Sequence, residues 1–365
     1  MNAWHPRQLW QKLAAPVDEP LMAFSMLLLG VSLLALASAS PERLGSQFVN
    51  IAVALAVMRV AAQVPPQRLM HLALPVYVFG VLLLIAVALF GDVSKGARRW
   101  LNLGFMRLQP SELMKIAMPL MLAWYFQKRE TWLRLKDHVV ATLLLLLPVA
   151  LIARQPDLGT AVLVLAAGFY VIFLAGLPWK VIIGLTVSAI VAAPVAWGFL
   201  HDYQRARILT LIDPEKDPLG KGFHIIQSTI AIGSGGILGK GWGRGTQSQL
   251  EFIPERHTDF IFAVLSEEFG LLGNLVLLAI YALLIGRGLM IAANAATLFT
   301  RLLAGAVTLI FFTYALVNMG MVSGLLPVVG VPLPFVSYGG TALVTLFLGI
   351  GILMSIHKNR MLVQK

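Results

Sequence analysis

The chain has 365 residues, of which 58% are hydrophobic and 12% charged, with a formal net charge of +11. A soluble domain carries about 25% charged residues, so this composition excludes a soluble protein and predicts one membrane domain over residues 1–365. The absence of cysteine excludes disulfides and thiolate metal sites, and the scattered histidines predict no metal site.

The apolar runs predict an all-α, polytopic integral membrane protein. The first 20 residues contain no apolar core, so they do not resemble a cleavable signal peptide. A membrane-spanning helix needs about 20 mostly apolar residues. Ten such helices are expected, at about 21–39, 46–64, 69–90, 110–126, 138–153, 159–176, 178–199, 259–285, 301–323 and 336–355. One long loop, at about 200–258, separates the seventh from the eighth.

Basic loops predict the orientation. An even number of crossings puts both termini on one side, and the cluster of Lys128, Arg129, Arg134 and Lys136 places that side in the cytoplasm. The long loop is then extracytoplasmic. The outer side nevertheless carries as many Lys and Arg residues as the inner side. Either long loops escape the charge rule, or the outer surface is built to hold an anion.

Four of the expected helices start on the outer side, near residues 110, 159, 259 and 336. Their starts carry polar residues that suit ordinary helix caps. Because the four positive helix ends face one compartment, they also suit a phosphate-bearing ligand. The polar residues concerned include Gln155, Asp157, His257 and Ser337.

Charged residues inside the expected spans need an explanation. Lys115 lies about one turn beyond Pro110 in an apolar run, where a charge is costly, and Glu112 shares its helix face. The two form either a structural ion pair or, as we expect, the polar floor of a ligand site. Glu267 and Glu268 lie about 12 Å beyond residue 259 along the next outer helix. They are either buried or mark the membrane boundary.

Two loops carry further candidates. Arg98, Arg99 and Trp100 in the loop 91–109 form either an interfacial belt or a patch that stacks a sugar and holds a phosphate. Arg205 and Arg207 add cations near the start of the long loop. Its glycine-rich part, at 233–245, fails the phosphate-loop pattern, so neither nucleotide nor nucleic-acid binding is expected.

The long loop ends on Glu255, Arg256, His257 and Asp259. Asp259 either caps the following helix or acts as a general base. A cap would lower the pKa of this carboxyl group, whereas nearby Glu255 and burial would raise it, as a base requires. The sequence alone leaves both roles open.

These motifs resemble those of the SEDS family (shape, elongation, division and sporulation), in particular its rod-shape-determining members from Gram-negative bacteria. The matching stretches follow the family order over nearly the whole chain. They lie at 95–100, 109–112, 155–160, 201–205, 245–249, 254–260 and 330–340.

The resemblance implies ten transmembrane helices and a peptidoglycan glycosyltransferase that acts outside the bacterial inner membrane during cell elongation. Its substrate would be lipid II, a disaccharide-pentapeptide on undecaprenyl pyrophosphate. A class B penicillin-binding protein would supply the transpeptidase, beside other membrane proteins of the elongation complex. Two alternatives stay open, a lipid II flippase and a non-catalytic scaffold, although the few ionisable residues within the spans favour an enzyme over a flippase.

By this resemblance Asp259 is the essential acidic residue of the outer loop, a general base in an inverting transfer. The basic outer face would hold the leaving pyrophosphate. A divalent cation there is compatible with the sequence, although no ligand cluster requires one. The residues expected to contact substrate are Arg98, Arg99, Trp100, Glu112, Lys115, Gln155, Asp157, Arg205, Arg207, Gln247, Glu255, Arg256, His257 and Ser337.

Overall fold

The computed structural model describes residues 18–94, 97–102, 107–130, 133–199, 202–216, 221–253 and 255–360. Helices dominate these residues. The long helices are α2 (Glu19–Ala39), α3 (Leu44–Ala61), α4 (Pro66–Phe90), α5 (Pro110–Gln127), α6 (Leu135–Arg154), α7 (Leu158–Leu174), α8 (Trp179–Phe199), α12 (Ile261–Ala293), α13 (Leu298–Val322) and α14 (Gly340–Asn359). The shorter elements are η1 (Pro41–Arg43), β1 (Asp92–Ser94), β2 (Ala97–Asn102), β3 (Arg107–Leu108), α9 (Asp202–Ile212), η3 (Pro214–Lys216), α10 (Lys221–Ser234) and α11 (Thr246–Gln249).

Each of the ten expected spans coincides with a long helix. Among the described residues, seven helices are long and apolar enough to cross a membrane, while α7 and the apolar part of α8 are shorter. Helix α5, which carries Glu112 and Lys115, is not among the seven. The prediction of an all-helical polytopic membrane protein is confirmed, and the number of ten crossings stays a prediction.

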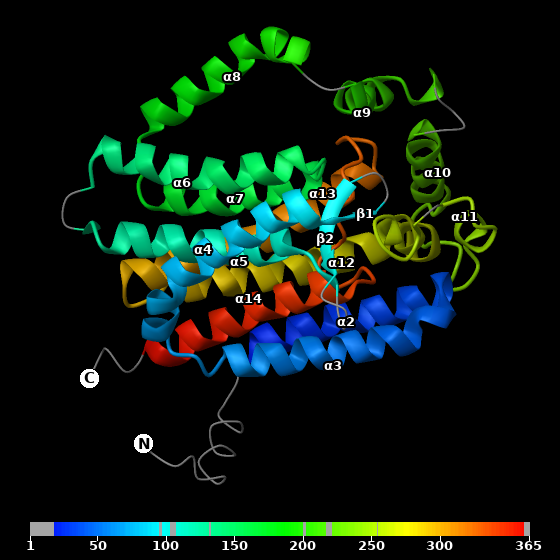
Figure 1. Ribbon diagram of the computed structural model, residues 1–365. Coiled ribbons are helices and arrows are strands. Elements are labelled where there is room, and N and C mark those ends of the chain that lie inside the picture. Colours follow the sequence, from blue (N-terminus) through cyan, green and yellow to red (C-terminus); the bar gives the residue numbers. More distant parts are fainter. Residues whose placement is uncertain are drawn as a thin grey trace.

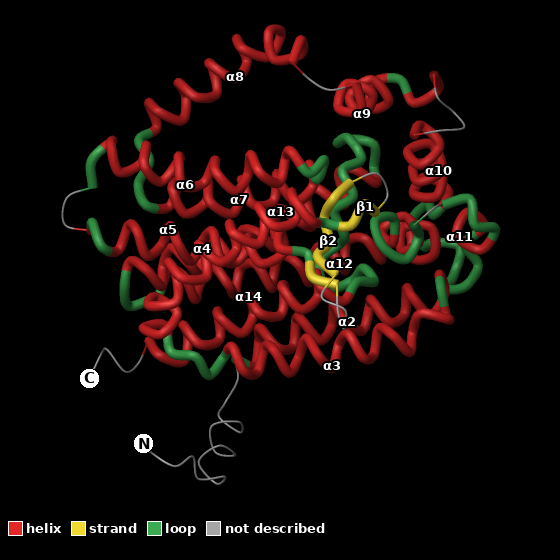
Figure 2. The backbone as a smooth tube through the Cα atoms, viewed as in Figure 1, coloured by secondary structure: helices red, strands yellow, loops and turns green. Residues whose placement is uncertain are grey.

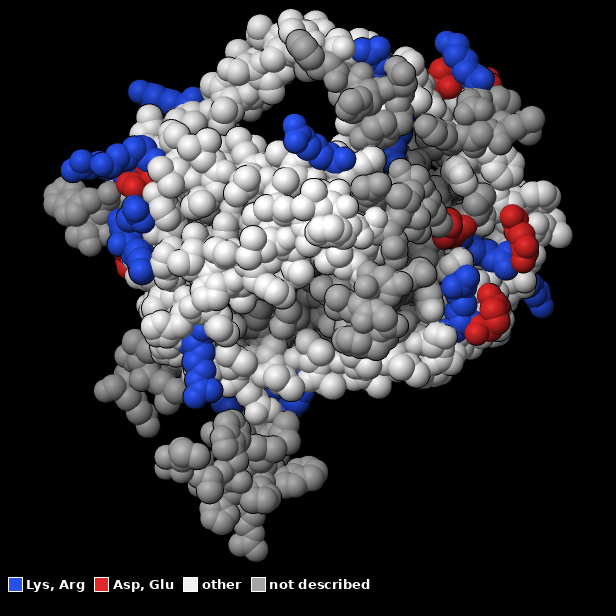
Figure 3. Space-filling view, viewed as in Figure 1, with Lys and Arg blue, Asp and Glu red and all other residues white. Residues whose placement is uncertain are grey.

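The long helices except α8 run side by side in one bundle (Figures 1 and 2). The described chain begins and ends at one end of this bundle, the termini end, whereas the β-strands and α9 to α11 lie at the opposite end, the loop end. Helix α8 stands apart, with an open hollow between it and the bundle (Figure 3). On the face shown, Lys and Arg gather mostly at the two ends, as expected of a bundle surrounded by lipid.

Helix α13 lies at the centre of the bundle. In its most apolar stretch 72% of the residues are buried, compared with 22% in the span that includes α3. Aromatic rings pack beside it, with Phe335 edge-on to both Phe311 and Phe347 at 5.3 Å between ring centroids. A helix so enclosed can position polar side chains away from lipid.

The structure corrects three local expectations. Residues 91–109, expected as a loop, form the antiparallel sheet β1-β2-β3, which satisfies backbone groups between the adjacent helices α4 and α5. The long loop contains α9, α10 and α11. Helix α14 starts at Gly340 instead of 336, because the backbone of Gly339 (φ 161°, ψ 123°) is not helical.

Helix α12 is interrupted at Gly270, whose φ of 62° and ψ of −158° are not helical. The long loop fills the gap. The N–H groups of Lys240 and Gly241 donate to the carbonyls of Glu267 and Glu268, each at 3.0 Å, and the N–H of Leu271 donates to the Gly236 carbonyl at 2.9 Å. The glycine-rich segment therefore supplies hydrogen-bond partners for the backbone groups that the break in α12 leaves unpaired.

Glu267 and Glu268 are both buried, as one of the two alternatives required. Glu267 accepts hydrogen bonds from Lys240 Nζ at 2.7 Å and from the first-turn N–H groups of α11, and Glu268 accepts one from Ser38. These carboxylates fix the long loop onto α12 and α2.

At the termini end, Asp18 joins three helices. Its side chain caps α2 through the Leu21 N–H at 3.0 Å, and Arg287 of α12 donates to both its oxygens, at 3.1 and 2.6 Å. His357 Nε2 of α14 lies 3.4 Å from Oδ2. Burial opposes ionisation, but the bonds from Arg287 and Leu21 outweigh it, so the pKa of Asp18 lies below its ordinary value.

Replacing Asp18 by Asn should lower the melting temperature of the protein in detergent and reduce its sensitivity to acid. A lowered pKa means that the stabilisation is complete above the ordinary value near 3.8 and is lost as the pH falls through the folded value. Thermal unfolding between about pH 5 and pH 3 measures this, with Glu19→Gln as the exposed control. Equal acid sensitivity of Asp18→Asn and the unsubstituted protein would contradict it.

Candidate functional site

Asp259 lies in a turn at the loop end, directly before α12. The helix starts at Ile261, and Phe260 occupies the cap position without a capping side-chain bond. Asp259 therefore lies one residue before the cap position of α12, so it is not the helix cap that one alternative expected. A Cβ atom on Gly330 would lie 3.4 Å from its Oδ2, which places the half-buried carboxylate against the segment after α13.

Asn318 of α13 holds this turn from below. Its side-chain Nδ2 donates to the backbone carbonyl of Asp259 at 2.8 Å and to that of Val331 at 2.7 Å. The side chain is fully buried, and its Oδ1 has no hydrogen-bond partner among the described residues. One amide thus links a membrane helix to both segments around the Asp259 carboxylate.

The segment before α14 holds the same turn from the side. Ser337 Oγ donates to the Thr258 carbonyl at 2.6 Å, and the Tyr338 N–H donates to the His257 carbonyl at 2.9 Å. The rings of His257 and Tyr338 meet edge-on at 5.9 Å between centroids. Burial, helped by the positive charge of Arg43, lowers the pKa of His257, so its ring is mostly neutral at pH 7.

A second polar group forms where β2 meets the start of α7. Arg99 Nη2 donates to the Pro156 carbonyl at 2.8 Å, and its Nε lies 4.0 Å from Asp157 Oδ2. Asp157 also caps α7 through Thr160 N at 3.3 Å and accepts a bond from Gln109 at 3.2 Å. The helix-cap role is therefore present, and Arg99 adds a cation beside it.

A third group is buried one turn deeper. Lys115 Nζ lies 2.5 Å from Glu112 Oε1 and also donates to the Tyr314 hydroxyl of α13. Lys115 is only 2% exposed, so it is an intramembrane charge with a specific partner. The second oxygen of Glu112 is buried without a hydrogen-bond partner among the described residues.

The three groups lie close together. A Cβ atom on Gly159 of α7 would come within 2.6 Å of the Val329 carbonyl, so the start of α7 packs on the segment that contacts Asp259. Tyr314 and Asn318, four residues apart, share one face of α13. The fold thus gathers candidates from five separate parts of the sequence at the loop end of the bundle.

An apolar groove begins beside this site. Its volume is about 680 Å³ along α12 and α13, and its lining includes Phe262 and Leu325 at the loop end and Leu289 farther along. Phe262 follows Asp259 by less than one helical turn. The groove opens on the lateral surface of the bundle, where lipid would lie.

Two arginine candidates make their described contacts away from Asp259. Arg205 donates to the carbonyls of Trp197 and Gly198 at the end of α8, at 3.1 and 2.8 Å. Arg256 donates to the Ser248 carbonyl at 2.7 Å and to Glu251 at 2.9 Å.

The remaining candidates occupy varied positions. Gln247 contributes its backbone N–H to Glu267, and Gln155 donates to the Leu84 carbonyl at 3.0 Å. Glu255 accepts a bond from Thr258 within the Asp259 turn, at 3.2 Å. Three further candidates are less closely defined: Trp100 is half-buried in β2, Arg207 lies half-buried on α9, and the side chain of Arg98 lies outside the described residues.

Sequence reasoning missed Asn318 and Tyr314. Both lie in the expected span 301–323, and neither carries a charge at neutral pH. An amide in the middle of an apolar run was the available signal, since a polar group in a membrane needs a partner.

Comparison with known proteins identifies relatives over the whole fold. Residues 21–362 match the cell cycle protein family of FtsW, RodA and SpoVE. The chain is 53% identical over 364 residues to the peptidoglycan glycosyltransferase MrdB of Escherichia coli strain K12, covering 98% of both chains. It is 38% identical to MrdB of Helicobacter pylori strain J99, covering 90% of this chain and 87% of that one.

Solved structures agree with the fold. A chain of a peptidoglycan synthase complex, studied for the coordination of polymerization and crosslinking, matches with a TM-score of 0.82 and 36% identity, over 95% of this chain and 99% of that one. The rod shape determining protein RodA of Thermus thermophilus matches with a TM-score of 0.73 and 30% identity, over 95% and 98%. This chain therefore belongs to the SEDS family of FtsW, RodA and SpoVE proteins and is a peptidoglycan glycosyltransferase of the rod-shape-determining kind.

Proposed function

We propose that this enzyme polymerises lipid II into glycan strands, with Asp259 as the general base. The observation that carries the proposal is the fixed position of Asp259. Asn318 and Ser337 hold the backbone on either side of its Cα, while the carboxylate faces the Gly330 segment beside an apolar groove. A base held by buried donors keeps its geometry through a reaction cycle.

In the proposed step Asp259 removes the proton from the 4-hydroxyl of the acceptor GlcNAc. The oxygen attacks the anomeric carbon of the donor MurNAc from the face opposite the pyrophosphate. The new glycosidic bond forms as the bond from that carbon to the phosphate oxygen breaks, so the configuration inverts. The lipid pyrophosphate leaves as an anion.

Arg99 is the best-supported candidate to receive this anion. Its side chain is one-third exposed, and its buried Nε makes no hydrogen bond to a described residue. Lys115 and Glu112 would form the polar floor below. Within the described part of the chain, no three His, Asp or Glu side chains gather around a common point, so a divalent cation would depend mainly on the pyrophosphate for its ligands.

The groove along α12 and α13 supports a lipid-linked substrate. A polyprenyl chain can lie in an apolar groove that starts within one turn of the base, while the sugars stay at the loop end. We further propose that the protein lies in the bacterial inner membrane, with both termini cytoplasmic and the loop end periplasmic. A class B penicillin-binding protein would crosslink the product, as the similarity to a chain of a peptidoglycan synthase complex suggests.

Replacing Asp259 by Asn should abolish polymer formation by the purified protein, with its partner, from labelled lipid II. Loss of a general base lowers rates about 10²- to 10⁴-fold. Asp213→Asn, at an exposed ion pair of the same long loop, is the control and should retain activity. Undiminished polymerisation by a folded Asp259→Asn protein would remove Asp259 from the mechanism. Lipid II crossing a vesicle without polymerising would instead favour a flippase.

Replacing Asn318 by Leu should lower kcat about 10- to 100-fold and leave KM nearly unchanged, because misplacing a base affects the reaction more than binding. Thr308→Val is the matched control, since this buried hydroxyl on the same helix bonds only to the Ala304 carbonyl. Steady-state kinetics with both variants measures the difference. Equal kcat values for the two variants would assign Asn318 no part in positioning Asp259.

The role of the Glu112 and Lys115 pair can be separated from stability. Lys115→Met alone leaves a buried, unpaired carboxylate and should destabilise the protein by about 3–5 kcal/mol. The double variant Glu112→Gln, Lys115→Met removes both charges and should recover much of that stability. If the pair contacts the substrate, the double variant still polymerises at least about tenfold more slowly. Full activity of the double variant would limit the pair to a structural role.

A further inference from the structure

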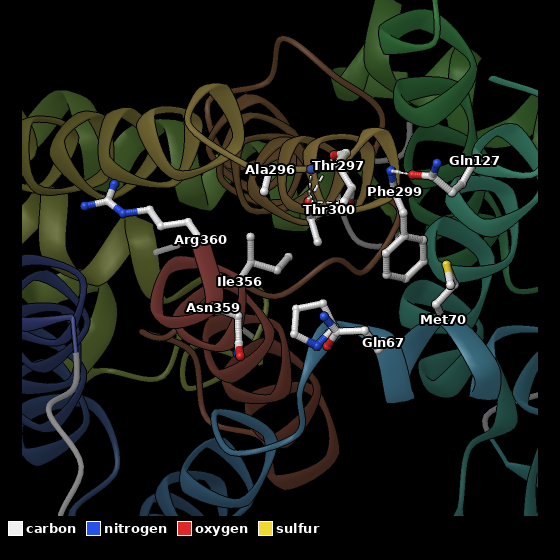
Figure 4. A pocket seen from close by; sticks show the side chains of 11 residues that line it. Gln67, Met70, Gln127, Ala296, Thr297, Phe299, Thr300, Ile356, Asn359 and Arg360 are labelled. Carbon is white, nitrogen blue, oxygen red and sulfur yellow. Dashed lines mark hydrogen bonds between the residues drawn. The ribbon is translucent and has the colours of Figure 1, made fainter. Parts of the chain in front are cut away.

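Another cavity lies at the termini end, on the opposite side of the membrane domain from Asp259 (Figure 4). Its volume is about 220 Å³. Four helices contribute to it: the starts of α4 and α13 and the ends of α5 and α14. The lining residues are Pro66, Gln67, Met70, Gln127, Ala296, Thr297, Phe299, Thr300, Ile356, Asn359 and Arg360.

The lining divides into two kinds of surface. Met70, Phe299 and Ile356 are apolar lining residues, and Gln67 and Asn359 are polar ones (Figure 4). The lining contains no Asp or Glu. A ligand with a polar head and an apolar body therefore matches this cavity better than a fully polar ion does.

Four cations lie on the helix ends that form the cavity, and one of them, Arg360, lines it. Arg360 extends from the end of α14 at the rim (Figure 4). Arg68, Arg301 and Lys358 are exposed and directly follow or precede a lining residue in the sequence. None of the four side chains forms an ion pair or hydrogen bond with another described residue. The starts of α4 and α13 also line the cavity. The N–H groups of Phe299 and Thr300 already donate to Gln127 and Thr297, so these helix ends contribute their dipoles, which favour an anion.

Two acidic side chains of the termini end are already engaged. Asp18 is paired with Arg287 and lies near His357, and the exposed Glu130 accepts a hydrogen bond from Gln127. The lining itself carries the positive charge of Arg360 and no acidic side chain. Basic pockets between transmembrane helices on the cytoplasmic side are suited to anionic lipid head groups.

We propose that this cavity binds the head group of an anionic phospholipid of the cytoplasmic leaflet. The phosphate would lie near Arg360 and the first turns of α4 and α13, and an acyl chain would pass along Met70 and Phe299. Such a lipid would join the ends of four helices, including α13, which carries Tyr314 and Asn318 at its other end. The site is separate from the glycosyltransferase reaction and does not depend on the role of Asp259.

The test uses the full-length protein in a neutral detergent, titrated with phosphatidylglycerol, phosphatidylcholine or inorganic phosphate. Bound lipid is counted by native mass spectrometry, and the melting temperature is recorded in parallel. Phosphatidylglycerol should bind and raise the melting temperature, whereas phosphatidylcholine and inorganic phosphate should not. Equal effects of the two lipids, or stabilisation by inorganic phosphate alone, would overturn the proposal.

Variants locate the site. Each cation near the head group contributes about 1 kcal/mol, or about a fivefold change in affinity, so Arg360→Gln should weaken binding about fivefold and the double variant with Arg68→Gln about 25-fold. Ala296→Phe should block the cavity without changing charge. Lys180→Gln, an exposed cation at the start of α8, is the control. Binding that is equal in all of these proteins would place the lipid elsewhere and overturn the proposal.

Discussion

A backbone group buried away from water must find a partner, and this constraint decides the architecture of the loop end. Helix α12 breaks at Gly270, which frees the carbonyls of Glu267 and Glu268. The long loop supplies the missing N–H groups from Lys240 and Gly241. A Cβ atom on Gly239 would lie 2.1 Å from the Glu268 carbonyl, so only glycine permits this approach. The loop is thereby fixed to a membrane helix and can form a stable wall above the bundle.

The same principle positions the candidate base. The turn before α12 has irregular backbone, and its carbonyls are satisfied by side chains from other elements, Asn318 on α13 and Ser337 before α14. Because α13 is largely enclosed by other helices, its polar face does not contact lipid. That face carries Tyr314, in contact with Lys115, one turn from Asn318. One buried helix therefore organises both the turn around Asp259 and the charged pair below it, which couples the geometry of the two groups.

Much of the site was predictable because some motifs have only a few physical roles. A charge in an apolar run, as at Lys115, must be paired, and its partner Glu112 lay at helical spacing. The positions of the loop arginines were not predictable, since most of their hydrogen bonds go to backbone carbonyls, which every residue type presents. Arg256, for example, bonds to Ser248 at the end of α11, a helix that the sequence pattern did not indicate. Asn318 was missed because its two acceptors come from segments that only the fold brings together.

The four helix starts expected near residues 110, 159, 259 and 336 lie together at the loop end (Figure 1), and their roles differ. The sequence by itself determined the membrane class, the helix positions and the polar residues at the outer ends, because the apolar runs are long and charges within them are costly. Tertiary structure decided that Asp157 caps α7 while Asp259 precedes the cap of α12. It also decided the β-hairpin after α4, the break at Gly270 and the contact between Asp259 and the Gly330 segment. These features depend on hydrogen bonds between residues far apart in the chain, and no local pattern encodes such pairings.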